Sequence, residues 1–239
     1  MAPAGGADTS RRPVPSRRVA NERQARAFFA ASSLLVSAGL ILQVVLSARA
    51  HGGSFGSGPG KVFNFFCFFT VQSNIVVAIT TGLLALRLDR TYTTFRTFRL
   101  VGVVAIAITG VVFHVALRDL RELTGWDAVA DFILHTASPV LTVAGFLFVG
   151  PRDLVSSRIV RLAVTAPVAW LALTLARGPL VQDVHGRDYY PYPFLDAQQH
   201  GYASVLLAVL VVAVLFVGVC AAAVAADRRL PGVRFPSPA

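Results

Sequence analysis

Apolar residues along this chain gather into six long runs, and charged residues gather in the segments between them. The runs cover residues 27–47, 62–86, 98–117, 129–149, 160–176 and 202–226. A helix needs about 20 apolar residues to cross the hydrocarbon core of a bilayer, so each run qualifies, the fifth being the shortest. The pattern therefore predicts an all-α, polytopic membrane protein, a bundle of six transmembrane helices over residues 27–226.

Composition agrees with that interpretation. The 239 residues are 55% hydrophobic and 14% charged, with a mean hydropathy of +0.64. A soluble domain usually carries about 25% charged residues. Little chain is left for a soluble domain beside the bundle. We expect a disordered cytoplasmic tail rich in Arg and Pro over residues 1–26 and a short cytoplasmic tail over residues 227–239.

Basic residues predict the orientation. Of the 22 Lys and Arg residues, 16 fall on the side of the two termini and 6 on the other side. The positive-inside rule then puts both termini in the cytoplasm of a multi-pass protein of the cell membrane. The net charge of +10 follows from this topology and favours contact with anionic lipid. No aromatic or RNA-binding pattern accompanies the Arg-rich tail, so we expect no nucleic-acid partner.

Two further patterns in the sequence bear on processing of the N-terminus and on disulfide or metal sites. Arg17-Arg18, the first run and the segment 48–50 together resemble a signal peptide with a cleavage site of small residues. Because the apolar core of a signal peptide is only about 7–15 residues long, we favour an uncleaved first helix. Cys67 and Cys220 fall at opposite sides of the membrane, and no CxxC or HxxxH spacing occurs, so neither a disulfide nor a metal site nor another cofactor is predicted.

Polar residues interrupt two of the runs at helical spacing. One stripe shares a face of the second predicted helix, and another shares a face of the fourth, where Pro139 predicts a kink. His114 lies at a similar depth in the third. If the stripes face each other, they form a small polar cavity in the outer half of the bundle. The first stripe contains Thr70, Ser73, Asn74, Val77 and Thr81, and the second contains Asp131, His135, Ser138 and Thr142.

These stripes also admit a structural interpretation. Ser and Thr in membrane helices often bond the carbonyl four residues back, which for Thr70 is that of Phe66. Asn side chains often join neighbouring helices. The outer loop 177–201 is similarly open to two interpretations, an aromatic belt at the interface or a lid over the cavity with Arg177 placed to hold a carboxylate.

Three short motifs resemble one family. FFTVQSN (68–74), LHTASPVL (134–141) and YPYPFLD (190–196) fall in order along most of the chain. In these motifs the chain resembles the androgen-induced membrane protein family, six-helix proteins that include animal hydrolases of fatty acid esters of hydroxy fatty acids. The resemblance implies a threonine nucleophile at Thr70 and a histidine base at His135. Animal members carry an acidic residue where this chain has Ser73.

The resemblance and the stripes together suggest a reaction. Thr70 attacks a lipid ester while His135 takes its proton, and water then cleaves the acyl-threonine. Ser73 and Asn74 are placed to donate to the oxyanion, and Asp131 to orient the imidazole. The substrate partner would be a membrane lipid or lipid ester. The alternatives are a transporter or channel for a small solute, whose polar cavity binds without reaction, and a purely structural membrane protein.

Overall fold

The computed structural model describes residues 22–120, 122–231 and 233–234. Most of the predicted N-terminal tail, including Arg17-Arg18, lies outside the described residues. The α-helices of the described residues are α1 (Glu22–Arg49), α2 (Gly58–Cys67), α3 (Phe69–Leu86), α4 (Thr93–Val112), α5 (Gly125–Phe132), α6 (Ser138–Ala144), α7 (Ser157–Arg177) and α8 (Ala197–Arg229).

Short helical turns extend several of these helices. The π-helical turns are η1 (Phe113–Leu117), η3 (Ile133–Ala137) and η4 (Gly145–Val149), and the 3-10 turns are η2 (Arg118–Leu120), η5 (Gly178–Leu180) and η6 (Pro193–Leu195). Two residue pairs, β1 (Pro151–Arg152) and β2 (Val233–Arg234), form a small parallel sheet. With their extensions, six helices among the described residues are long and apolar enough to cross a membrane. The predicted all-α polytopic bundle is therefore confirmed.

The boundaries differ from the prediction in three places. Helix α1 begins at Glu22, five residues before the first apolar run. The second run is not one helix, because Phe68 is extended and separates α2 from α3. Helix α8 begins at Ala197 and continues to Arg229, with Gly201 at a positive φ inside it, so it takes in part of the outer loop and of the C-terminal tail.

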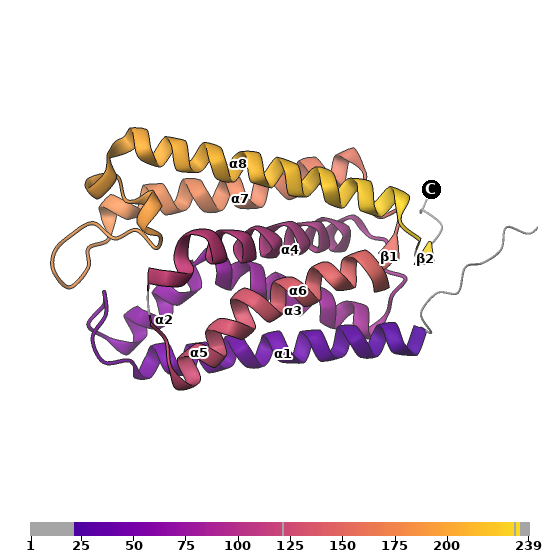
Figure 1. Cartoon of the computed structure of the whole chain (residues 1–239), viewed down its shortest axis with the longest axis horizontal. Helices are drawn as coiled ribbons and strands as arrows, with labels where there is room; N and C mark the ends of the chain where they lie inside the picture. The colour runs from indigo at the N-terminus through magenta and orange to yellow at the C-terminus, as the bar shows by residue number, and fades with distance from the viewer. Residues whose placement is uncertain (1–21, 121, 232, 235–239) are drawn as a thin grey trace, which may run out of the picture.

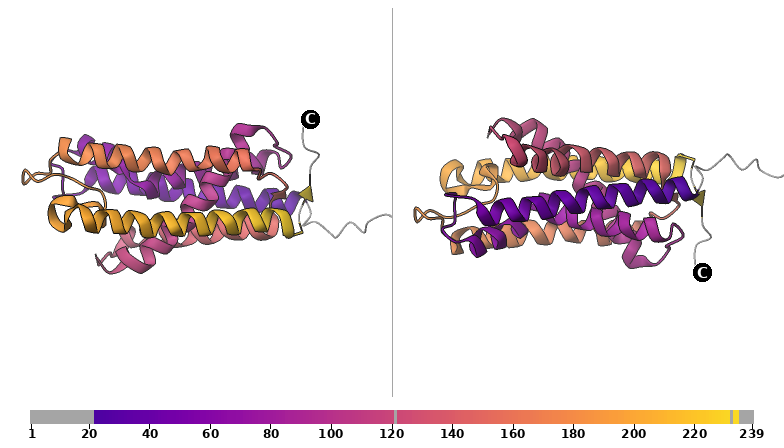
Figure 2. Two further views of the ribbon diagram at one scale, coloured as in Figure 1. Left: turned by 90° about the horizontal axis from the view of Figure 1, so that it is seen from above. Right: turned by 90° about the horizontal axis from the view of Figure 1, so that it is seen from below.

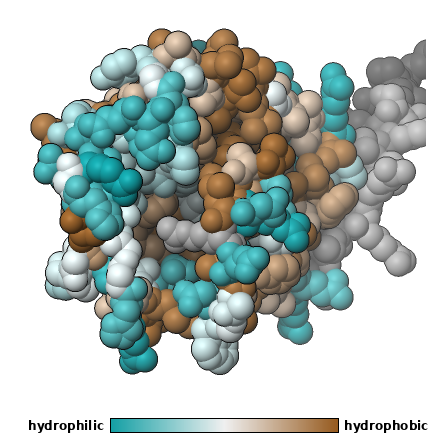
Figure 3. Space-filling model, turned by 60° about the vertical axis from the view of Figure 1, so that its left-hand side comes forward, coloured by the Kyte–Doolittle hydropathy of each residue, from teal (hydrophilic) through white to brown (hydrophobic). Residues whose placement is uncertain are grey.

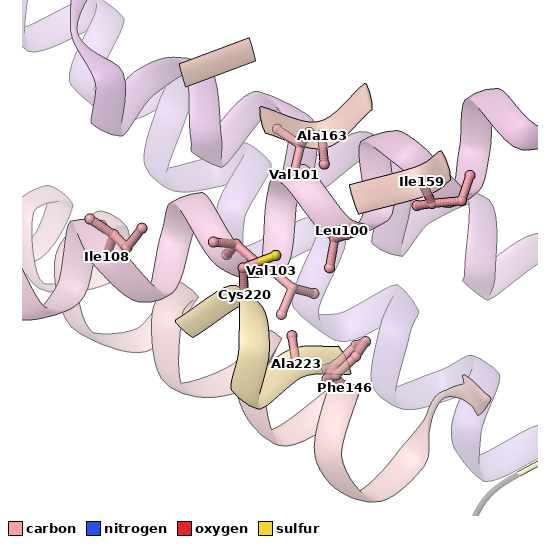
Figure 4. Packing of buried hydrophobic residues seen from close by; sticks show 10 residues of the cluster. Leu100, Val101, Val103, Ile108, Phe146, Ile159, Ala163, Cys220 and Ala223 are labelled. Carbon is pink, nitrogen blue, oxygen red and sulfur yellow. The ribbon is translucent and has the colours of Figure 1, made fainter. Parts of the chain in front are cut away.

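Helix α4 lies at the centre of the bundle. Helices α3 and α6 pack on one side of it and α7 and α8 on the other, while α1 packs against α3 (Figures 1 and 2). Its residues Leu100, Val103 and Ile108 meet Phe146 of η4 and Cys220 of α8 in the largest buried apolar cluster (Figure 4). Because α4 is central, this cluster joins residues of α4, η4, α7 and α8.

The bundle has two unlike ends. The start of α1, the end of α8 and the β1–β2 pair lie together at one end, called here the termini end (Figure 1). Helix α2, the segment 181–196 and the start of α8 lie at the other, called here the loop end. Hydrophilic residues gather over part of the loop end, next to hydrophobic flanks (Figure 3). On α8, large apolar side chains such as Leu206 and Val214 are exposed, as expected of a helix that faces lipid.

At the termini end, charged side chains are buried together. Arg99, Arg152 and Asp227 are each at most 5% exposed. Arg99 donates to the Pro151 carbonyl, Arg152 to carbonyls of η4, and Asp227 accepts the Val155 N–H. Burial lowers the pKa of Arg152, and the nearby Asp227 carboxylate opposes that shift. These bonds join α4, α8 and the segment after η4.

Candidate functional site

The break at Phe68 places Thr70 at the start of a helix inside the bundle. Two backbone groups next to the break are bonded by aromatic side chains from other segments. The Cys67 carbonyl accepts from Trp170 Nε1 at 3.0 Å, and the Thr70 N–H donates to Tyr192 Oη at 3.3 Å. Backbone polar groups within a membrane need such partners, because lipid offers none. Trp170 and Tyr192 therefore stabilise the break.

The Thr70 hydroxyl meets the same tyrosine. Thr70 Oγ1 lies 3.5 Å from Tyr192 Oη, and both side chains are buried. Burial raises the pKa of the Tyr192 hydroxyl, and hydrogen bonds with Thr70 and the neighbouring backbone oppose the shift. Tyr192 therefore carries its proton at neutral pH. Tyr192 Oη accepts the Thr70 N–H, and in its contact with Thr70 Oγ1 either hydroxyl can be the donor.

Both residues line a cavity of about 260 Å³ between α3, α4, α7 and α8. Its walls are almost wholly apolar, so it differs from the small polar cavity that the stripes suggested. The polar exceptions are the hydroxyls of Thr70, Thr109 and Tyr192. Its remaining walls come mainly from α7, α8 and η6, including Pro167, Val168, Trp170, Leu195, Val209, Ala213, Phe216 and Val217. The arrangement suits a hydrocarbon chain with one polar group near Thr70.

Ser73 and Asn74 hold main-chain groups. Ser73 Oγ donates to the Thr70 carbonyl at 2.9 Å and lies 3.3 Å from Thr109 Oγ1. Asn74 Nδ2 donates to the carbonyls of Thr70 and Leu134 at 2.8 and 3.1 Å. Their donors are engaged by the backbone, and Asn74 ties α3 to the π turn that carries His135. All five residues of the first predicted stripe are buried, Val77 and Thr81 included.

His135, in the π turn η3, belongs to a second group of side chains. This group packs on another face of α4. Its Nδ1 lies 2.9 Å from Asp131 Oδ1, one helical turn earlier, as the spacing predicted. Its ring stacks on Phe113, with ring centroids 4.1 Å apart. Within the described residues, His135 does not line the cavity at Thr70 and makes no hydrogen bond to Thr70. The structure thus brings His135 to Asp131 and leaves Thr70 with Tyr192.

Two of the histidines inside the spans lie in π-helical turns. His114 is in η1 and His135 in η3, and Thr136 Oγ1 lies 3.3 Å from His114 Nε2. Pro139 is the second residue after η3, and because it has no N–H, it cannot continue the regular bonding pattern. The proline thus accompanies a π turn, in place of the simple kink that the sequence suggested. Such turns occur often at functional sites.

Arg177 lies at the loop end, at the start of the predicted lid. Its guanidinium donates to Asn64 Oδ1 at 3.2 Å and lies over the rings of Phe63 and Tyr189. Asn64 Nδ2 in turn donates to the Tyr189 hydroxyl at 2.9 Å. Arg177 thus joins α7 to α2 and to the aromatic loop.

Sequence reasoning did not single out Tyr192, Trp170 or Thr109. The aromatic loop was recognised as a belt or lid, but nothing in its spacing distinguishes Tyr192 from its neighbours. Trp170 is one apolar residue in an apolar run, and its role depends on a helix break elsewhere. Within the described parts of the chain, no group of three or more His, Cys, Asp or Glu side chains could hold a metal ion.

The fold and the site define an integral, multi-pass membrane protein with an apolar cavity that ends at a buried threonine. No protein-family model, curated protein or solved structure matches the chain.

Proposed function

We propose that the protein is an intramembrane hydrolase of lipid esters, of the fatty acid ester of hydroxy fatty acid type, located in the cell membrane. Thr70 is the nucleophile and His135 the base. The observation that carries the proposal is the buried Thr70 hydroxyl on the wall of an apolar cavity, next to the hydroxyl of Tyr192. The three motifs that resemble the androgen-induced membrane protein family support it.

Substrate binding uses the cavity. The acyl chain lies between α4, α7 and α8, and its ester carbonyl lies beside Thr70. Developing negative charge on the carbonyl oxygen would meet two sources of stabilisation. Tyr192 donates its hydroxyl proton, and the first turn of α3 supplies the partial positive charge of a helix N-terminus. Tyr192 takes the role that the sequence suggested for Ser73 and Asn74, whose donors already bond carbonyls.

The reaction has two halves. Thr70 Oγ1 bonds the carbonyl carbon as its proton passes to His135 Nε2, and the alcohol leaves with that proton when the ester C–O bond breaks. Water then attacks the acyl-threonine, His135 again carries the proton, and the fatty acid and Thr70 are released. Asp131 holds Nδ1, which leaves Nε2 as the acceptor. Proton transfer requires His135 to approach Thr70, a movement that we assign to the π turn η3.

Turnover by purified protein tests the proposal. A panel of lipid esters in detergent micelles should release fatty acid, and Thr70→Ala should lower the rate by about 10³-fold or more, because the residues of such a unit act together. His135→Gln should have a similar effect. Thr81→Ala and His114→Gln are the matched controls, since Thr81 lies on the same helix away from the cavity and His114 in the other π turn. A folded Thr70→Ala protein with unchanged turnover would refute the proposal.

One observation favours a second function. Thr70 and His135 are not hydrogen-bonded to each other, and a protein that binds a lipid chain without cleaving it has no need of that contact. In that case no ester of the panel would be hydrolysed by the wild type, although lipid would still occupy the cavity. The apolar lining favours a lipid chain over the small polar solute of a transporter or channel.

A further inference from the structure

The cavity at Thr70 opens on the lipid-facing side of the bundle, between α7 and α8. These helices run side by side against α4 but make few contacts with each other (Figure 2). Val168 of α7 and Val217 of α8 both line the cavity, and they are 59% and 67% exposed. A side chain that lines a cavity and is also exposed marks its mouth. The mouth is therefore a slit whose edges are apolar.

The loop end of the same cavity is closed. Leu195 is 1% exposed there, and the Tyr192 ring stacks on Phe194 and meets Trp170 edge to face. The ring of Tyr190 covers Gly178, where an added Cβ would overlap the ring. Any larger residue at position 178 would push the loop away from α7. Packed aromatic rings thus line the cavity on the side of the outer loop, while its lining residues between α7 and α8 are exposed.

The cavity is aligned with the membrane-spanning helices. Thr70 is in the first turn of α3 at the loop end, whereas Val168 and Val217 lie near the middle of their helices. A bilayer lipid has the same alignment, with its ester near the interface and its chain directed to the middle of the membrane. The volume of about 260 Å³ is just below the range of about 300–1,000 Å³ for ligand pockets, which suits a single chain.

We infer that one unbranched acyl chain of a lipid from the leaflet at the loop end enters sideways between α7 and α8. Its tail lies at Val168 and Val217 and its ester at Thr70. The position of the ester rests on the proposed function, whereas access through the slit does not require hydrolysis. The substrate class is therefore a lipid already in the bilayer rather than an ester delivered from water.

A photo-crosslinking experiment tests the slit. The full chain is placed in phosphatidylcholine vesicles with a non-hydrolysable ether lipid that carries a diazirine near the end of its chain. Crosslinks are mapped by mass spectrometry. We expect them on cavity-lining residues of α7 and α8, in Thr70→Ala as well as in the wild type. Crosslinks spread evenly over all lipid-facing helices would overturn the inference.

Closing the slit gives the matched comparison. The double variant Val168→Trp and Val217→Trp should lower crosslinking in the cavity by roughly tenfold, because bulky rings fill the mouth. Leu173→Trp with Val214→Trp is the control, since both residues are exposed on the same helices and neither lines the cavity. Equal crosslinking in the two double variants would contradict the inference.

A second way to close the slit uses a chemical crosslink between α7 and α8, so it does not depend on how well the tryptophans pack. Val168→Cys and Val217→Cys, in a protein without Cys67 and Cys220, are joined by a short reducible bifunctional reagent after folding. Crosslinking to lipid should fall and should return on reduction. If the wild type hydrolyses no ester but its crosslinking to lipid still depends on the slit, only the proposed reaction is refuted.

Discussion

A buried backbone N–H needs a partner, and at Thr70 that partner is the hydroxyl of Tyr192. An unsatisfied buried donor costs about 1–3 kcal/mol, so this hydroxyl contributes to the fold as well as to the site. The same oxygen lies within 3.5 Å of Thr70 Oγ1, the atom that we propose as nucleophile. One loop residue therefore connects the stability of the α2–α3 break with the chemistry of the cavity.

Removal of that hydroxyl should be measurable. Tyr192→Phe keeps the ring and leaves the Thr70 N–H without its partner, so we expect the free energy of unfolding to fall by about 1–3 kcal/mol. Ester turnover should fall too, because the proposed oxyanion donor is lost. Unfolding in mixed micelles gives the first quantity. Tyr190→Phe is the control, since its ring still covers Gly178. Equal stability of the two variants would show that the Tyr192 hydroxyl is not needed.

Part of the site could be predicted at the level of single residues. Helical spacing predicted the buried face of α3 that contains Thr70, Ser73 and Asn74, and it predicted the Asp131–His135 pair. Tyr192 could not be predicted, because its position depends on how a loop of 16 residues between Leu180 and Ala197 folds back on α3. Whether Thr70 and His135 act together stays a prediction.

At the scale of helices, the break in the second span has the largest consequence. It divides a continuous hydrophobic run into α2 and α3 and places the N-terminus of α3 beside the cavity. Hydrophobic runs predicted the six spans well, because the bilayer requires length and apolar composition. The break was not predictable, since neither Pro nor Gly occurs at Phe68 and its partners come from α7 and the outer loop.

The indole of Trp170 provides the test at this scale. Trp170→Phe removes the donor to the Cys67 carbonyl and should lower the free energy of unfolding by about 1–3 kcal/mol. The chain has only one other tryptophan, Trp126, which is 68% exposed. Trp126→Phe should leave stability nearly unchanged in the same unfolding measurement. If the second span were one continuous helix, the Cys67 carbonyl would not need the indole as a donor. Trp170→Phe and Trp126→Phe would then both change the free energy of unfolding only slightly.

For the whole molecule, the unlike ends agree with the asymmetry of charge. Along the sequence, 16 of the 22 Lys and Arg residues fall in the tails and connections predicted on the side of the termini, and 6 fall in the other connections. The positive-inside rule therefore predicts that the termini end faces the cytoplasm. With that orientation, the slit between α7 and α8 would receive lipid from the outer leaflet.

Labelling of cysteines tests the orientation. In a protein without Cys67 and Cys220, His51→Cys at the loop end should react with a membrane-impermeant maleimide in intact cells. Asp89→Cys at the termini end should react only after the cells are made permeable. Both positions are exposed in the structure, so a difference in reactivity reports the side of the membrane. The reverse pattern would invert the topology and move the proposed access to the inner leaflet.

The central claim is that Thr70 is a nucleophile, and covalent labelling tests it most directly. A lipophilic fluorophosphonate should add once to the wild type, on the peptide that contains Thr70, as read by intact-protein and peptide mass spectrometry. Thr70→Ser should keep part of the labelling, because the hydroxyl survives, and His135→Gln should lower it strongly. Thr81→Ala should label like the wild type. The account predicts no adduct on folded Thr70→Ala, and labelling of that variant at the wild-type rate would contradict it.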